Sequence, residues 1–151
     1  MRHLNQKGTF KILWVTALAW FIAQSLKVLI YWYRTHKINF RLFVGTGGMP
    51  SSHSAFAACL ATTIGLESGW GSPVFMLSLG VAIIIMSDAA GVRRAAGLQA
   101  KILNQIIGDL YRSRPVPPQR LKELIGHTPV QVIVGALIGI FIALGIYSIV
   151  R

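Results

Sequence analysis

The chain has 151 residues, of which 54% are hydrophobic and 13% are charged. A soluble domain carries about a quarter charged residues, and the hydrophobic residues here gather in long runs, so the composition excludes an ordinary soluble domain and favours an integral membrane protein. The formal net charge of +11 points to anionic head groups or phosphate rather than nucleic acid, since no soluble basic domain is present.

The first apolar run covers residues 12–33 and ends in Tyr31, Trp32 and Tyr33, aromatic residues typical of a membrane interface. It is about as long as the ~20 residues that a span needs, and longer than the core of a secretory signal, so we expect a retained transmembrane helix. Lys27 lies near enough to its end for the ammonium group to reach the interface.

The second run covers residues 54–66 and follows Pro50-Ser51-Ser52-His53. Ser51 or Ser52 is a good N-cap, and the free N–H groups and the dipole of a helix start favour an anion. His53 would then stand beside a bound phosphate, although it is alternatively a polar interface residue of a capped helix. The run is short for a full span unless neighbouring helices shield it.

The third run covers residues 74–90 and carries Asp88 near its end, where an acid is costly unless it is paired. Arg93 and Arg94 follow directly. They are either anchors of the positive-inside kind or a guanidinium fork for phosphate oxygens, and one of them would neutralise Asp88. We expect no metal, because no second carboxylate lies near Asp88 in the sequence.

Residues 92–111 alternate apolar and polar side chains at helical spacing, which predicts an amphipathic helix at the interface or against the bundle. The proline-rich residues 114–118 end it, and a short helix is expected over residues 120–125. The fourth apolar run, residues 128–149, is the clearest transmembrane segment. Its Gly135-x-x-x-Gly139 motif is expected to pack helices within the monomer.

A second histidine, His127, lies at the start of the fourth run. Gln131 follows one turn later on the same face, so its amide oxygen can accept from one ring nitrogen of His127 and direct the other. The alternative is an interface histidine beside a helix cap. Two imidazoles at helix starts can share one phosphate, which makes phosphoryl transfer at a membrane surface the leading hypothesis.

These elements predict an all-α integral membrane helical bundle, with about four transmembrane helices and one amphipathic interfacial helix, as a single domain over residues 1–151. Residues 34–50 and 91–127 fall on one side of the membrane and hold most of the Lys and Arg. The positive-inside rule puts that side, with both histidines, in the cytoplasm. The sequence leaves a homo-oligomer open.

The histidine segments resemble those of a known superfamily. Pro50-Ser51-Ser52-His53 is similar to the Pro-Ser-Gly-His motif of the type 2 phosphatidic acid phosphatase superfamily, which includes the vanadium-dependent haloperoxidases. His127-Thr128-Pro129-Val130-Gln131-Val132, followed by Gly135, resembles its His-x-x-x-Asp-Val-x-x-Gly segment. Residues 88–97 resemble a block of the small divergent branch of that superfamily.

The resemblance implies a membrane phosphatase that hydrolyses a lipid phosphate, or a related phosphomonoester or pyrophosphate, through a phosphohistidine intermediate. It implies that His127 attacks phosphorus, that His53 protonates the leaving alkoxide, and that Ser51 and Ser52 hold phosphate oxygens. Such chemistry uses arginines and amides in place of a metal or another cofactor.

Three departures from the superfamily pattern bear on activity. Gln131 stands where an orienting aspartate is expected, and Leu121 where an arginine is expected. No good match to the superfamily's Lys-x-x-x-x-x-x-Arg-Pro motif is found before the first histidine, and Lys37 and Arg41 are the nearest candidates.

The departures keep two other hypotheses open. One is a non-catalytic membrane protein of the same fold that binds anionic lipid or a protein partner. The other is a small transporter or channel subunit, for which Asp88 and Lys27 would be the intramembrane charges.

Overall fold

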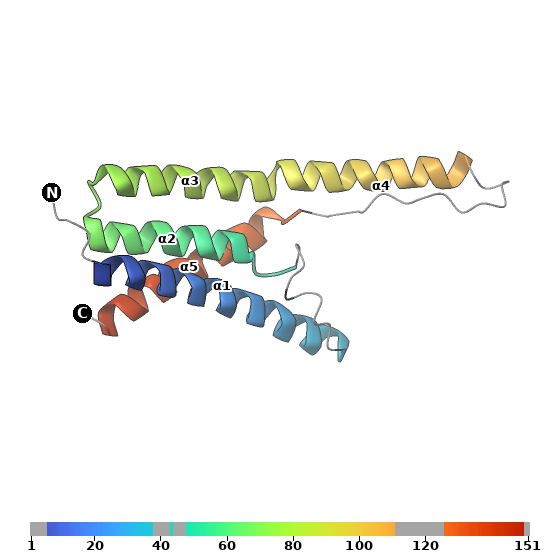
Figure 1. Cartoon of the computed structure of the whole chain (residues 1–151). Helices are drawn as coiled ribbons and strands as arrows, with labels where there is room; N and C mark the ends of the chain where they lie inside the picture. The colour runs from blue at the N-terminus through green and yellow to red at the C-terminus, as the bar shows by residue number, and fades with distance from the viewer. Residues whose placement is uncertain (1–5, 38–42, 44–47, 111–125, 150–151) are drawn as a thin grey trace.

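The computed structural model describes residues 6–37, 43, 48–110 and 126–149, and within them it has five helices and no strand (Figure 1). The helices are α1 (Gln6–Thr35), α2 (Ser52–Ser68), α3 (Pro73–Ala90), α4 (Val92–Leu110) and α5 (Pro129–Ile149). The all-α bundle predicted from the sequence is confirmed, and the apolar runs coincide with helices. The short helix expected over residues 120–125 lies outside the described residues.

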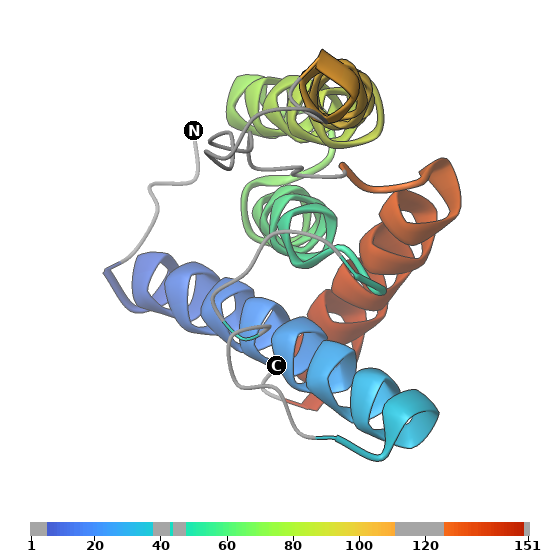
Figure 2. The same cartoon turned by 90° about the vertical axis from the view of Figure 1, so that its right-hand side faces the viewer.

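The central helix of the bundle is α2. It contacts α1, α3 and α5, and Figure 2 shows these helices on three sides of it. Small buried residues such as Ala55 and Ala58 let the neighbouring backbones approach. Thr62 and Thr63 donate their hydroxyl protons to the carbonyls of Ala58 and Cys59, so these buried polar side chains are satisfied within the helix.

The two glycines of the small-residue motif join α5 to α2. A Cβ atom on Gly135 would overlap the carbonyl oxygen of Ser51, and one on Gly139 would overlap that of Ala55. The Ser51 N–H also donates to the Gln131 carbonyl, at 3.1 Å. The motif therefore packs two helices of one monomer, as predicted, and ties the start of α2 to the first turn of α5.

Three helical stretches of the described residues are long and apolar enough to cross a membrane: Gly8–Thr35, Pro73–Asp109 and Pro129–Ile149. With 17 residues, α2 falls short of this length, at about 26 Å. Its position inside the bundle supplies the shielding that the short second run required. Large apolar side chains are exposed around the bundle, among them Trp14, Leu77, Ile84, Ile133 and Phe141. The chain is an integral membrane protein, and we expect these exposed side chains to face lipid.

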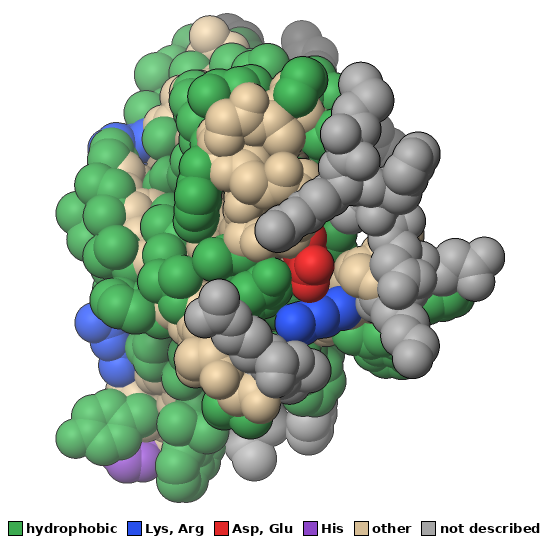
Figure 3. Space-filling model, turned by 90° about the vertical axis from the view of Figure 1, so that its left-hand side faces the viewer, with side chains coloured by type: hydrophobic (Ala, Val, Ile, Leu, Met, Phe, Trp, Pro, Cys, Tyr) green, Lys and Arg blue, Asp and Glu red, His purple; other side chains and the backbone are tan. Residues whose placement is uncertain are grey.

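A polar cluster closes the end of the bundle where α1 begins. Lys11 lies 3.6 Å from the Glu67 carboxylate and 4.1 Å from the centre of the Tyr147 ring, and the Tyr147 hydroxyl donates to the Leu66 carbonyl. Figure 3 looks onto this end, where a few charged side chains interrupt a mostly hydrophobic surface. The cluster links α1, α2 and α5 at the end of α2 remote from His53.

At the other end of the bundle, α3 gives way to α4 at Gly91, whose φ of −104° and ψ of −84° lie outside the helical region. Nearly in line with α3, α4 extends beyond the bundle and contacts only α3 among the described helices (Figure 1). The helix predicted here is present, and apolar residues such as Val92 and Ile102 and polar residues such as Lys101 and Gln105 are exposed along it. Its place at the membrane interface stays a prediction.

Candidate active site

Two histidines from distant parts of the chain meet where α2 and α5 begin. His53 lies in the first turn of α2, and His127 lies two residues before α5. Their ring centroids are 6.4 Å apart and the ring planes are inclined by 55°. His127 is buried, with 4% of its surface exposed, whereas His53 is exposed. The arrangement gives one sheltered imidazole and one that a ligand can approach freely.

The ring of His127 is held in a fixed orientation. Its backbone N–H donates to the Ala89 carbonyl, at 3.1 Å, and its Nδ1 lies 3.2 Å from Gln131 Oε1. The same Oε1 accepts from the Thr128 N–H, which identifies it as the amide oxygen. An amide oxygen only accepts hydrogen bonds, so the network assigns the proton of neutral His127 to Nδ1. The lone pair is then on Nε2.

Burial lowers the pKa of His127 below its ordinary value of 6.5. The hydrogen bond to Gln131 opposes this shift, and the nearby charges of Lys27 and His53 add to it. A lowered pKa means that the imidazole is neutral at pH 7, which is the protonation state that a nucleophile requires.

The start of α2 offers hydrogen-bond donors to an anion. Ser51 is the N-cap, and its Oγ accepts from the N–H and the hydroxyl of Ser54. Ser52 is 1% exposed, and its Oγ has no hydrogen-bond partner among the described residues. The N–H groups of Ser52 and His53, in the first turn, have no partner within the helix. A phosphate oxygen would satisfy these groups, since a buried hydroxyl without a partner is costly.

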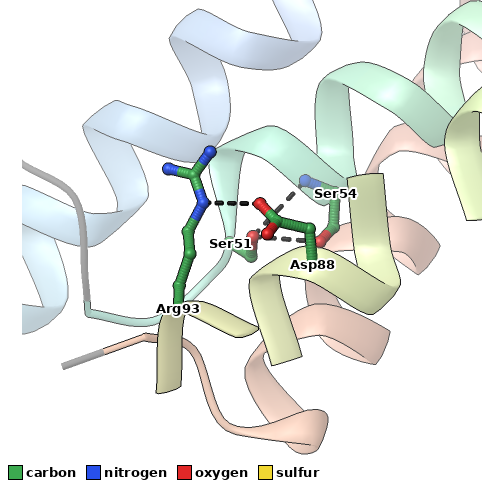
Figure 4. A network of polar contacts seen from close by, with 4 residues as sticks. All are labelled: Ser51, Ser54, Asp88 and Arg93. Carbon is green, nitrogen blue, oxygen red and sulfur yellow. Dashed lines mark hydrogen bonds and ion pairs between the residues drawn. The ribbon is translucent and has the colours of Figure 1, made fainter. Parts of the chain in front are cut away.

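The carboxylate of Asp88 pairs with a guanidinium, as the sequence predicted. Arg93 Nε donates to Asp88 Oδ2, at 2.6 Å. Figure 4 shows this pair together with Ser51 and Ser54 at the start of α2. The charges of Arg93 and Asp88 both act on His53, so the pair lies beside the site.

The backbone at the start of α4 packs closely against Gly126, the residue before His127. A Cβ atom on Gly126 would overlap the backbone nitrogen of Arg94 and lie 2.6 Å from the Arg93 carbonyl carbon. This contact holds the first turn of α4 near the histidines. The Arg94 side chain is exposed.

One residue that our sequence interpretation assigned to the membrane interface belongs to the site. Lys27 of α1 is only 2% exposed, so the prediction that it reaches the interface is wrong. Gly48 covers it: a Cβ atom there would lie 3.2 Å from Lys27 Cγ, and the φ of +83° also favours glycine. The charge of Lys27 acts on both His53 and His127, and no carboxylate of the described residues pairs with it.

A signal for Lys27 was present in the sequence. Six residues separate Lys27 from Arg34, and Thr35 follows, so the stretch matches Lys-x-x-x-x-x-x-Arg-Pro except for the final proline. Arg34 is exposed at the end of α1. Lys37 and Arg41 were the two candidates that the sequence offered for this motif. Lys37 is exposed, and Arg41 lies outside the described residues. Leu121, which stands where the superfamily has an arginine, also lies outside them.

The polar side chains at the site suit an anion better than a cation. Its charged groups are mainly Lys27 and Arg93, and the described residues contain no group of three His, Cys, Asp or Glu side chains that could hold a metal ion. Hydroxyl, ammonium, guanidinium and backbone N–H donors surround two imidazoles. This is the donor set that binds phosphate.

Comparison with known proteins gives the chain a family. No solved structure gives a significant match. The chain is similar to the uncharacterized membrane protein YuiD of Bacillus subtilis (strain 168), with 41% identity over 133 residues that cover 81% of this chain and 84% of that protein. Residues 9–142 match the divergent PAP2 family, and the chain belongs to it.

Proposed function

We propose that the chain is a membrane phosphatase that hydrolyses a lipid phosphate, or a related phosphomonoester or pyrophosphate, through a phosphohistidine on His127. The observation that carries the proposal is the 6.4 Å separation of the two imidazoles, one buried and one exposed. Two imidazoles at this distance can both contact one phosphate group that lies beside them, one ring at phosphorus and the other at the leaving oxygen. Membership of the divergent PAP2 family supports it.

The phosphate is bound before it reacts. Lys27 approaches from α1 and Arg93 from the start of α4, while the Ser52 hydroxyl and the first N–H groups of α2 supply neutral donors. Asp88 holds the Arg93 guanidinium, and is therefore a positioning residue. Arg94 and Ser51 complete the set that we assign to phosphate oxygens. These donors also stabilise the charge on the equatorial oxygens during transfer.

In the first chemical step, Nε2 of His127 forms a bond to phosphorus and the bond from phosphorus to the leaving alkoxide breaks. Partial burial and the charges of Arg93 and Lys27 lower the pKa of His53 in the free protein, so His53 takes up a proton from water when the phosphate dianion binds beside it, and then gives that proton to the alkoxide. Gln131 keeps the proton of His127 on Nδ1, so that the lone pair of Nε2 faces the phosphate.

In the second step, water replaces the alkoxide. Its oxygen bonds to phosphorus, the P–N bond to His127 breaks, and His53, now neutral, takes the proton from the water. Inorganic phosphate leaves and both imidazoles return to their starting states. We further propose that the site lies on the cytoplasmic face, because the excess of Lys and Arg is on the side of the histidines.

A specific observation also favours a second function. A neutral amide, Gln131, orients His127 where the superfamily has a carboxylate. An amide stabilises the imidazolium less, so a protein that only binds anionic lipid in the same site is the alternative.

Purified protein in lipid vesicles, screened over lipid phosphates and pyrophosphates, tests the proposal. His127→Ala should abolish phosphate release, and His53→Ala should slow it strongly. His36→Asn, which changes an exposed histidine at the end of α1, is the matched control and should keep full activity. Full activity in the His127 variant would refute the nucleophile assignment. Binding of lipid phosphate without hydrolysis by the unmodified protein would favour the second function.

A further inference from the structure

The apolar face of α4 is exposed and follows the spacing of a heptad repeat. Val92, Ala95, Gln99, Ile102 and Ile106 recur at alternating steps of three and four residues, so they lie in one stripe along the helix. Val92 is 69% exposed, Ile102 56% and Ile106 49%, and the other two are also exposed. We call these five residues the α4 stripe. It is about 21 Å long and ends before Asp109, the next position of the spacing.

No other helix of the described residues covers the α4 stripe, since α4 contacts only α3 among them. The two helices form a nearly straight rod, Pro73–Asp109, of 37 residues (Figure 1). Such a rod is about 55 Å long, whereas the hydrocarbon core of a bilayer is about 30 Å thick, which α3 alone nearly spans. In this arrangement α4 extends out of the bilayer, where hydrocarbon does not reach most of the stripe.

The charged side chains of Arg94 and Lys101 lie away from the α4 stripe. They follow Val92 and Gln99 by two residues, a step of about 200° round the helix, and so are on nearly the opposite side. Two identical stripes can therefore meet without bringing these like charges together. Copies in one membrane have the same orientation, so a pair has its two-fold axis along the membrane normal and its α4 helices parallel. Each residue of the stripe then faces its own counterpart.

Gln99 favours a second copy over lipid as the occupant of the stripe. It has two apolar residues of the stripe on each side. Against hydrocarbon its amide would be buried without a hydrogen-bond partner, which is costly. In a parallel pair, the amide of one Gln99 can donate to the amide oxygen of the other. A single polar residue at such a position fixes the register of two helices, and β-branched residues such as Val92 and Ile106 at the equivalent positions favour two strands.

We infer that a second copy of this chain packs along the α4 stripe, so that the protein is a dimer joined by a short parallel coiled coil of its α4 helices. This inference does not depend on the proposed function. The seam covers only about two heptads, but the bilayer already holds the copies parallel and close together. The first turn of α4 also carries Arg93, which pairs with Asp88, and packs against Gly126 beside His127. The dimer interface is therefore continuous with the turn that contributes to the candidate site.

Cysteine cross-linking of the full chain in membranes tests the inference. The background is low, because Cys59 is the single cysteine and is buried. With a short bifunctional thiol reagent, Gln99→Cys should be converted largely to a covalent dimer, because its two thiols meet at the two-fold axis. Lys101→Cys, exposed on the far side of the same helix, is the matched control and should form little dimer. Equal yields in the two variants would overturn the inference. So would the absence of dimer from both, which would mean that the same chain or lipid covers the stripe.

A second pair of variants measures the dimer without a cross-link. Ile102→Asp places two like charges face to face, so the protein mass measured by light scattering in mild detergent should fall by half. Lys101→Asp changes a charge away from the α4 stripe and should leave the protein dimeric. Circular dichroism checks that both variants keep their helices. A monomeric unmodified protein, or a dimer that persists in Ile102→Asp, would reject the inference and leave the phosphatase proposal intact.

Discussion

At the scale of single residues, the pairing of His127 with Gln131 sets the pH range of the proposed reaction. Burial lowers the pKa of His127 below 6.5, and the neutral amide only partly offsets this. The nucleophile is the neutral imidazole, so its activity is lost as the pH falls through that lowered pKa. We therefore expect the acid limb of kcat/KM assigned to His127 to lie below pH 6.5, the ordinary imidazole value.

Gln131→Asp tests this explanation. A carboxylate at this position stabilises the imidazolium, so the pKa of His127 rises and the acid limb should move to higher pH. A pH profile of kcat/KM measures the shift, with Gln105→Asp on the exposed face of α4 as the control. An unmoved acid limb in the Gln131 variant would show that the limb does not report His127.

Lys27 provides the second prediction at this scale. Lys27→Met keeps the length of the buried side chain but removes its charge, and no carboxylate of the described residues is left unpaired. A charge-assisted hydrogen bond contributes about 1.5–3 kcal/mol, so kcat/KM for a lipid phosphate should fall about 10- to 100-fold. Lys101→Met, on exposed α4, is the control. Equal activity in the two variants would remove Lys27 from the phosphate site.

The hydrogen bond between His127 and Gln131 could be predicted from the sequence, whereas the burial of Lys27 could not. Gln131 lies four residues from His127, and helical geometry alone brings such residues together, so that hydrogen bond was predictable. Lys27 is buried because Gly48, 21 residues later in the chain, packs against its side chain. The hydropathy of residues 12–33 alone cannot predict that contact.

At the scale of helices, the contact of α5 with α2 should be sensitive to a single methyl group. Gly135→Ala and Gly139→Ala place a Cβ against the carbonyl oxygens of Ser51 and Ala55, and overpacking of this kind costs about 1–3 kcal/mol. Gly145→Ala, in the same helix but with no atom within 4 Å of its Cβ, should be neutral. Thermal unfolding in detergent measures the three variants. Equal stabilities would mean that the motif does not join these helices.

Helix positions followed from apolar runs, and the breaks between them followed from glycine and proline. The central position of α2 was only partly predictable: its short length required shielding, but no pattern within residues 54–66 named the helices that provide it.

At the scale of the whole molecule, the orientation in the membrane and the single domain over residues 1–151 stay predictions. Cys59 is buried, so new cysteines can report on the two sides. In intact cells, an impermeant maleimide should label Gly71→Cys, between α2 and α3, and should label Lys37→Cys, beyond α1, only after permeabilisation. Both positions are exposed. The reverse pattern would place the histidines outside the cytoplasm without changing their chemistry.

The most direct test of the shared histidine site is to trap the intermediate. Protein mixed with a radiolabelled lipid phosphate, quenched with alkali within its first turnover and digested, should carry an acid-labile phosphate on His127. His53→Ala should form it more slowly, and His127→Ala should form none. Turnover of the substrate with no phosphate on His127, or with phosphate on a different residue, would contradict the account.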